Sequence, residues 1–144
     1  MATVREILAR KGPAVVTVTA TTTVLEAARL MNERGIGAVV VLERGVPCGI
    51  FTERDLMRRV VAERRDPATT EVREVLTAEL VTTREEMAVE ECAALMTNRR
   101  VRHLPVAGPQ GLAGIVTIGD LLAWQVSEQA STIAHLNSYL YDTR

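Results

Sequence analysis

The feature that most constrains this 144-residue chain is an internal duplication. A shift of 65 residues aligns 16–61 with 81–126 without a gap. A shift of 68 residues aligns Val4–Leu8 with Val72–Leu76, so each copy includes a leading segment and the second copy has three fewer linker residues. A duplicated sequence specifies the same structural unit twice. The chain therefore has material for two small units that share an interface.

Each copy is expected to repeat one series of elements, read from its apolar periodicity. In the first copy we expect a β segment at 15–18, a helix near 23–34, strands at 38–42 and 46–51, and a helix from Thr52 that buries Leu56, Met57, Val60 and Val61. In the second copy we expect a helix at 88–99, strands near 103–107 and 111–116, and a helix from about 118. Strands that alternate with helices predict the α/β (α+β) class.

The duplication also predicts the domain boundaries. The first unit with its leading helix covers 1–64, the second with its leading helix covers 65–127, and a C-terminal amphipathic helix or tail covers 128–144. The connecting segment 63–70 is charged and contains Pro67, which is typical of solvated chain between units.

The tail has a helical apolar spacing of its own. Ile133, Leu136 and Leu140 stand at i, i+3 and i+7, so the last helix is expected to continue or restart as an amphipathic segment. Its apolar stripe needs a surface to cover, either on its own chain or on a second subunit.

Composition excludes several classes of function. The 17 basic and 18 acidic residues give a net charge of −1, which provides no overall attraction to nucleic acid or to an anionic membrane. The chain has no basic start followed by an apolar run and no long apolar span, so we expect a soluble, cytoplasmic protein. Cys48 and Cys92 lack metal-site or disulfide spacing and are interpreted as core thiols. Neither lies beside a candidate base, so catalysis is not expected.

A repeated motif marks the point where each unit passes from a strand into a helix. Gly49-Ile50-x-Thr52-x-x-Asp55-Leu56 matches Gly114-Ile115-x-Thr117-x-x-Asp120-Leu121. One interpretation is a capping box, with Thr at the N-cap and Asp at N3. Another is a ligand site, because the Thr hydroxyl and free backbone N–H groups can donate to phosphate or sugar oxygens while Asp accepts from two vicinal hydroxyls. The preceding Gly lets another group approach closely. The two interpretations are compatible.

The tandem arrangement, the repeated Gly-h-x-Thr-x-x-Asp ending and the strand at Val101–Val106 closely resemble paired CBS domains, or a Bateman module, of the stand-alone bacterial type. The resemblance extends from about Val4 to Val126. It implies two CBS units of β-α-β-β-α topology packed around a pseudo-twofold axis, plus a C-terminal helix. It also implies two clefts that take AMP, ADP, ATP or S-adenosylmethionine, and assembly into a homodimer.

Carried over by position, the resemblance implies two sets of ligand-binding residues. Asp55 and Asp120 would hold ribose hydroxyls, and Thr52 and Thr117 would contact ribose or the first phosphate. The set for the first motif is Val16, Thr17, Gly37, Ala38, Ile50, Thr52, Arg54 and Asp55. The set for the second is Val81, Thr82, Arg102, His103, Leu104, Pro105, Ile115, Thr117, Gly119 and Asp120.

The two clefts differ in charge. Where the first copy has Gly35, Gly37 and Ala38, the second has Arg100, Arg102 and His103, so the second cleft is predicted to prefer phosphate-bearing ligands. Alternatively, Arg99 and Arg100 form a solvated basic helix end that interacts with the helix dipole. Arg54, matched by Gly119, could also supply cationic charge to the first cleft.

These observations favour a nucleotide-sensing regulator that acts in trans on a protein partner. The alternative is a structural dimerisation or scaffolding module whose clefts stay empty. A catalytic cofactor, a metal and a membrane are not expected, and the basic cluster at 99–103 is a weak footprint for nucleic acid.

Overall fold

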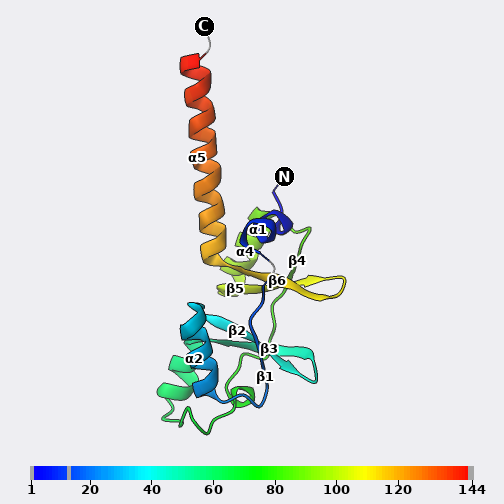
Figure 1. Ribbon diagram of the computed structural model, residues 1–144, viewed down its shortest axis with the longest axis vertical. Coiled ribbons are helices and arrows are strands. Elements are labelled where there is room, and N and C mark those ends of the chain that lie inside the picture. The colour runs from blue at the N-terminus through cyan, green and yellow to red at the C-terminus, as the bar shows by residue number, and fades with distance from the viewer. Residues whose placement is uncertain (1, 13, 143–144) are drawn as a thin grey trace. The chain divides into compact units, whose positions relative to one another are not determined.

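The computed structural model describes residues 2–12 and 14–142, which fall into two compact units. The central unit comprises residues 14–82. The terminal unit combines the N-terminal residues up to 13 with residues from 83 onward. In Figure 1 it contains the blue N-terminal helix together with the yellow and red C-terminal elements.

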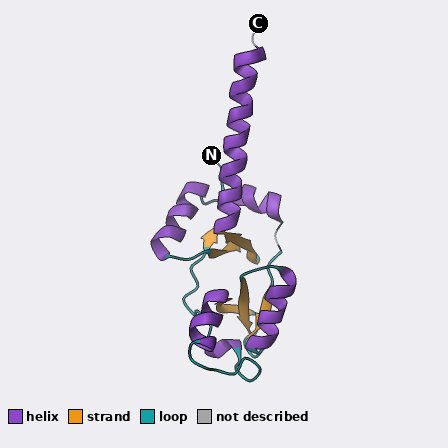
Figure 2. Ribbon diagram, turned by 90° about the vertical axis from the view of Figure 1, so that its left-hand side faces the viewer, coloured by secondary structure: helices purple, strands orange, loops and turns teal. Residues whose placement is uncertain are grey.

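The central unit is a three-stranded sheet with helices against it, as Figure 2 shows by colour. Its elements are β1 (Thr17–Thr19), α2 (Val24–Arg34), β2 (Ala38–Glu43), β3 (Val46–Thr52), α3 (Glu53–Asp55), the π-helix η1 (Leu56–Val61) and the 3₁₀ turn η2 (Val72–Glu74). The sheet order is β1-β2-β3, with β1 parallel and β3 antiparallel to β2.

The terminal unit repeats this sheet. Its elements are α1 (Val4–Lys11), β4 (Thr83–Arg84), α4 (Val89–Arg99), β5 (His103–Gly108), β6 (Gly111–Thr117) and α5 (Ile118–Asp142). The order is β4-β5-β6, again parallel then antiparallel. The registers also match, since Ala38 pairs with Thr52 and His103 pairs with Thr117, and both hairpins have a bulge at the equivalent place. The predicted α+β class, the β-α-β-β-α order and the C-terminal helix are confirmed.

The leading segments pack with the opposite copy of the repeat. α1 precedes the first copy in sequence, yet its Val4 N–H donates to Met87 O at 2.9 Å in the terminal unit. The matching segment before the second copy lies in the central unit, where Ile50 and Thr77 exchange backbone hydrogen bonds of 3.0 and 2.9 Å. The boundaries expected from the sequence, 1–64 and 65–127, therefore differ from the boundaries of the compact units.

The connecting segment 63–70 packs onto the central unit. The N–H of Val24 donates to Thr70 O at 2.8 Å, and that of Leu25 donates to Pro67 O at 3.0 Å, so two of the first donors of α2 find their acceptors there. Thr70 is buried. The expectation of solvated chain holds for most side chains of this segment, but its last residue belongs to the unit.

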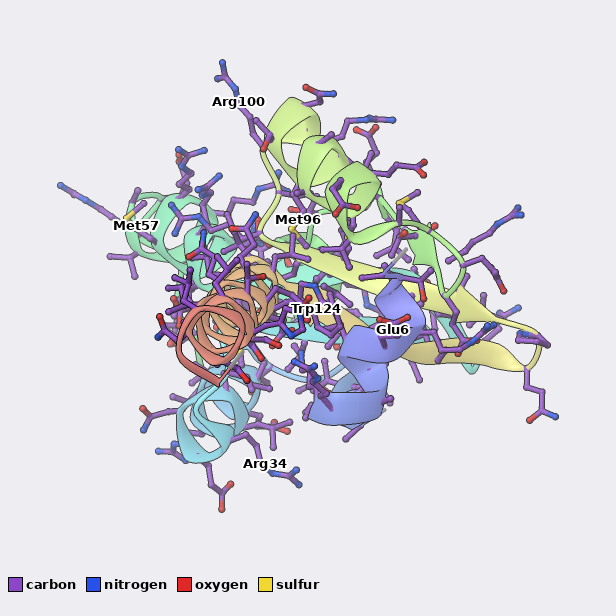
Figure 3. The ribbon with its side chains drawn as sticks, turned by 90° about the horizontal axis from the view of Figure 1, so that it is seen from above. Glu6, Arg34, Met57, Met96, Arg100 and Trp124 are labelled. Carbon is purple, nitrogen blue, oxygen red and sulfur yellow. The ribbon has the colours of Figure 1, made fainter. Side chains whose placement is uncertain are left out.

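The burial of side chains in η1 differs from the prediction at two positions. Val60 is buried and Leu56 packs against the core, but Met57 is 58% exposed and Val61 is 65% exposed. The prediction of burial was wrong for Met57 and Val61. The sheet covers the side of the helix that carries Leu56 and Val60, and the next residue after each of these points to a different side. Figure 3 shows Met57 directed outward.

In the described part of the chain, no helix is long and apolar enough to cross a membrane.

Candidate functional site

Both strand-to-helix turns form the predicted capping box. In the central unit the Asp55 N–H donates to Thr52 Oγ1 at 3.2 Å, and the Thr52 N–H donates to Asp55 Oδ2 at 3.1 Å. In the terminal unit the Asp120 N–H donates to Thr117 Oγ1 at 3.1 Å, and the Thr117 N–H donates to Asp120 Oδ2 at 2.8 Å. Each Asp is therefore held at a helix N-terminus by two hydrogen bonds to its own turn.

The central-unit carboxylate is enclosed by its own unit. The Thr52 hydroxyl also donates to Asp55 Oδ2 at 3.2 Å, and the Thr77 hydroxyl donates to Oδ1 at 3.0 Å. Arg59 Nε lies 3.6 Å from Oδ1 and adds a cation. With these partners in place the Asp55 side chain is only 7% exposed. A ligand could reach this carboxylate only by displacing internal hydrogen bonds.

The terminal-unit carboxylate is more open and meets a different cation. Lys11, at the end of α1, donates from Nζ to Asp120 Oδ2 at 2.7 Å and to the backbone oxygen of Ile115 at 2.8 Å. The Asp120 side chain is 22% exposed and that of Lys11 is 29% exposed. Because the pair is partly solvated, its ion pairing contributes little to stability, and the flexible Lys stem can adjust to another partner.

Asp120 lies in a pocket of about 260 Å³. Its lining residues are Ile7, Arg10, Lys11, Asp120, Ala123 and Trp124. The Arg10 guanidinium stands over the Trp124 ring, 4.3 Å from its centroid, in a cation–π contact. In Figure 3 Trp124 lies on the side of α5 that faces α1.

The pocket combines one carboxylate, two cations and one aromatic ring, which gives it a net positive charge. Such a set can hold an anion through Arg10 and Lys11, accept hydrogen bonds from hydroxyls at Asp120, and contact a flat ring at Trp124. Among the residues that the structure describes, no cluster of His, Cys, Asp or Glu could hold a metal ion.

The motif glycines are explained by the leading segments. A Cβ on Gly49 would lie 2.8 Å from Leu76 Cδ1 and 2.6 Å from the backbone oxygen of Thr77. A Cβ on Gly114 would lie 2.7 Å from Leu8 Cδ2. Leu8 and Leu76 are equivalent under the 68-residue shift. The close approach that these glycines allow is therefore made by a leucine of the protein itself.

The central unit contains the first predicted set of site residues and the start of the second. Gly37 and Arg54 frame the capping box, because the Glu53 N–H donates to Gly37 O at 3.0 Å and Arg54 lies exposed beside Asp55. Thr17 begins β1, and Ala38 and Ile50 lie buried in β2 and β3. Val81 and Thr82 are the last two residues of this unit.

The remaining residues of the second set lie on β5, on β6 and at the start of α5. Ile118 N–H donates to Arg102 O at 3.0 Å, which repeats the contact made by Gly37. His103 is half-buried opposite Thr117, and Leu104 is fully buried. Pro105 and Ile115 are paired on neighbouring strands, and Gly119 is exposed beside Asp120.

The basic residues that distinguish the second copy lie at the end of α4. Arg100 occupies the C-cap in the left-handed conformation, with φ 54°, where the first copy has Gly35 with φ 63°. It is exposed and points away from α4 in Figure 3. This placement fits a solvated helix end for Arg100. The cations beside Asp120 come instead from α1.

The sequence motifs did not single out Arg10, Lys11, Thr77 or Trp124. The signal that could have found the first three is the 68-residue shift, which aligns Ala9 with Thr77 and Lys11 with Glu79, so the leading segments carry different groups. The 65-residue shift likewise aligns Trp124 with Arg59 in the sequence. Interpreting these mismatches requires knowing that each leading segment packs with the other copy.

Comparison with known proteins agrees with this architecture. The family model of the CBS domain matches residues 4–62 and 72–127. The CBS domain-containing protein YhcV of Bacillus subtilis is 39% identical over 123 residues, which cover 85% of this chain and 87% of YhcV.

Solved structures show the same likeness. A protein with CBS domains from Burkholderia ambifaria superposes with a TM-score of 0.85 at 40% identity, covering 89% of this chain and 96% of that one. A hexameric CBS-CP12 protein from bloom-forming cyanobacteria gives a TM-score of 0.76 at 33% identity, covering 85% of this chain and 70% of that one.

Proposed function

This chain belongs to the CBS-domain family, and on that basis we propose that it is a regulatory module that binds an adenine nucleotide and acts in trans on a protein partner. The ligand would be AMP, ADP, ATP or S-adenosylmethionine. The observation that carries this proposal is the pocket of the terminal unit, where Asp120 stands beside Arg10, Lys11 and Trp124.

Each part of a nucleotide has a matching group in this pocket. The Asp120 carboxylate is 22% exposed and can accept from the two vicinal hydroxyls of a ribose. Arg10 and Lys11 supply the cations that a phosphate requires, and Arg can do so with two parallel hydrogen bonds. Trp124 offers an aromatic face to a purine. The predicted preference of the second cleft for phosphate-bearing ligands gains support from Arg10 and Lys11.

The central unit would be the weaker site. Its Asp55 is enclosed by Thr52, Thr77 and Arg59, so a ribose would have to replace hydrogen bonds that the fold already makes. We therefore propose that the terminal unit binds first and that occupancy of the central unit requires a local rearrangement. The ligand contacts assigned to the other predicted site residues are part of the same proposal.

Isothermal titration calorimetry of the full chain with AMP, ADP, ATP and S-adenosylmethionine tests this proposal. Asp120→Asn should weaken binding roughly tenfold or more, because it removes the charged acceptor for two hydroxyls. Asp66→Asn is the matched control, since Asp66 is exposed and lies in the other unit. Absence of heat with every adenine ligand would refute the sensing role, and equal affinity of Asp120→Asn and wild type would refute the site.

The second candidate is a structural dimerisation module with empty sites, and a repeated surface feature favours it. Met57 and Val61 are 58% and 65% exposed, and their equivalents Leu122 and Val126 are 56% and 64% exposed. Apolar side chains repeated at equivalent exposed positions suit a protein interface. Such an interface is compatible with ligand binding, so we propose a homodimer in either case.

We propose no catalytic role. The groups at Asp120 suit binding, and incubation of the full chain with ATP followed by chromatography should show no conversion of the nucleotide. Formation of ADP or AMP above a buffer control, lost in Asp120→Asn, would make the module an enzyme. We place the regulator in the cytoplasm, where free adenine nucleotides would reach it.

A further inference from the structure

An exposed apolar seam runs along α5. Its positions alternate in steps of four and three residues: Leu122, Val126, Gln129, Ile133, Leu136 and Leu140. The five apolar members are 56%, 64%, 59%, 53% and 66% exposed in that order. Alternating steps of four and three give the 3.5-residue period at which two helices keep one seam in contact, so this stripe has the pattern of a coiled coil.

The terminal unit does not cover the distal part of this seam. Every described side chain from 125 to 138 is exposed, and in Figure 1 the orange and red turns of α5 extend beyond β5, β6 and α4 of the same unit. Ser127, Ser131 and Thr132 are only moderate helix formers, and most helical stability in proteins comes from packing of an apolar face rather than from propensity. A helix of this composition needs a partner along its apolar stripe.

We propose that the seam of α5 pairs with the same seam of a second copy, parallel and in register, as a two-stranded coiled coil. With Val126, Ile133 and Leu140 at a positions, Leu122, Gln129 and Leu136 fall at d. Two of the a residues, Val126 and Ile133, are β-branched, and Leu stands at two of the d positions, a combination that favours a parallel two-stranded coiled coil. This inference concerns the mode of assembly and does not depend on nucleotide binding.

Gln129 argues for a second copy and for the parallel arrangement. In a parallel pair in register, Gln129 faces Gln129, and each side-chain amide can donate to and accept from the other. In an antiparallel pair whose seams overlap fully, Leu122 against Leu140, Gln129 would face Ile133, which cannot satisfy the amide. One polar residue in a seam costs some stability and sets the register, as a buried Asn does in other coiled coils.

The flanks of the seam carry no charge that would oppose self-association. Positions e and g hold Ala123, Gln125, Ala130, Thr132, Asn137 and Tyr139. Charged residues at these positions normally select or reject partners. Uncharged flanks remove repulsion between identical helices and offer no electrostatic selection for a foreign helix. The nearest acidic residue, Glu128, lies at an outer c position.

Disulfide cross-linking of the full chain tests the pairing. Cys48 and Cys92 are first replaced by Ala, the residue that stands at the equivalent positions 113 and 27 of the other copy. In this background Leu136→Cys should form a disulfide dimer under mild oxidation, whereas Ser131→Cys, on the opposite side of α5, should not. Equal rates for the two variants would overturn the proposal. Preferential cross-linking between Val126→Cys and Leu136→Cys chains would overturn the parallel register.

A second measurement uses no cysteine. Ile133→Asp should weaken self-association roughly 100-fold or more in sedimentation equilibrium, because both chains lose an apolar layer and bring two like charges together. Ser131→Asp adds the same charge on the opposite side and should leave the association constant unchanged. Both positions are exposed, so both variants should keep the wild-type melting temperature at low protein concentration. Equal association constants for the two variants would exclude pairing through the seam.

Discussion

The two units have the same backbone fold, but the cation beside the motif aspartate comes from a different element in each. In the central unit the cation is Arg59 on the helix, and the leading segment supplies the Thr77 hydroxyl. In the terminal unit the leading segment supplies the cation Lys11, and the helix position of Arg59 holds Trp124. The first arrangement seals the carboxylate, and the second leaves it beside a pocket.

In this protein the duplication has preserved backbone contacts more strictly than side-chain environment. Strand registers, bulges and capping boxes match position by position because they depend on neighbours within a copy. Thr77 beside Asp55 and Lys11 beside Asp120 come from leading segments that pack with the other copy, and those segments have diverged. One sequence motif can therefore be enclosed in one unit and stand beside a pocket in the other.

The largest expected effect on stability concerns the motif glycines. Gly49→Ala should lower the unfolding free energy by about 3 kcal/mol, because its Cβ meets the backbone oxygen of Thr77 at 2.6 Å, which cannot move alone. Gly114→Ala should cost only about 1 kcal/mol, since its Cβ meets the side chain of Leu8, which can adjust its rotamer. Urea denaturation of both variants measures the difference. Equal losses would show that the leading segments pack equally tightly.

Alkylation of Cys92 should be about 100-fold slower than that of a thiol with an ordinary pKa. Burial raises the pKa of the Cys92 thiol to about 11, so at pH 8 far less thiolate is present than for an ordinary thiol. Cys48 is only half-buried and should react first with a thiol reagent. Mass spectrometry after timed alkylation, with Cys48→Ala and Cys92→Ala as controls, identifies the modified residue. Faster modification of Cys92 would contradict this packing.

The raised pKa of Cys92 also predicts the sign of a pH effect. The protonated thiol is favoured in the folded state, so its contribution to stability is complete below its ordinary pKa and declines as pH rises toward about 11. Wild type should therefore lose more unfolding free energy than Cys92→Ala between pH 8 and pH 10.5. Parallel pH curves for the two proteins would contradict the prediction.

A smaller effect is expected from neutralising the motif carboxylates. Asp55→Asn should cost about 2 kcal/mol, because the buried carboxylate accepts from Thr52 and Thr77 and faces Arg59. Asp120→Asn should cost about 1 kcal/mol or less, since the ion pair with Lys11 is partly solvated. Thermal unfolding monitored by circular dichroism compares the two. A larger loss at Asp120 would reverse the distinction between a sealed and an open site.

The smallest effect concerns the ends of α2 and α4. Arg100 has φ 54°, a conformation that Gly adopts without strain, so Arg100→Gly should change the unfolding free energy by less than about 1 kcal/mol and in the stabilising direction. Gly35→Arg, the reciprocal exchange, should destabilise by about 1 kcal/mol. Paired urea titrations give the signs. A destabilised Arg100→Gly would indicate that the Arg100 side chain makes a contact that stabilises the fold.

Much of the fold could be predicted because its determinants are local. Thr23 accepts from the Glu26 N–H at 3.2 Å and starts α2, and Gly35 ends that helix in the left-handed conformation. The capping boxes follow from residues three positions apart. Errors arose where burial depends on a distant surface. Met57 and Val61 were assigned to the core by periodicity alone, although the sheet reaches only the neighbouring side of the helix.

Local sequence patterns alone predicted that there are two similar units, in what order strands and helices follow one another in each copy, and where each Thr and Asp cap a helix. These features depend on residues a few positions apart, so a repeated pattern reproduces them. Three contacts follow from the three-dimensional fold and not from any local pattern: α1 packs with the second copy, Lys11 pairs with Asp120 across 109 residues, and the Thr77 hydroxyl donates to Asp55. Such contacts are set by chain topology, which carries no local sequence signal, and they make one motif open and the other sealed.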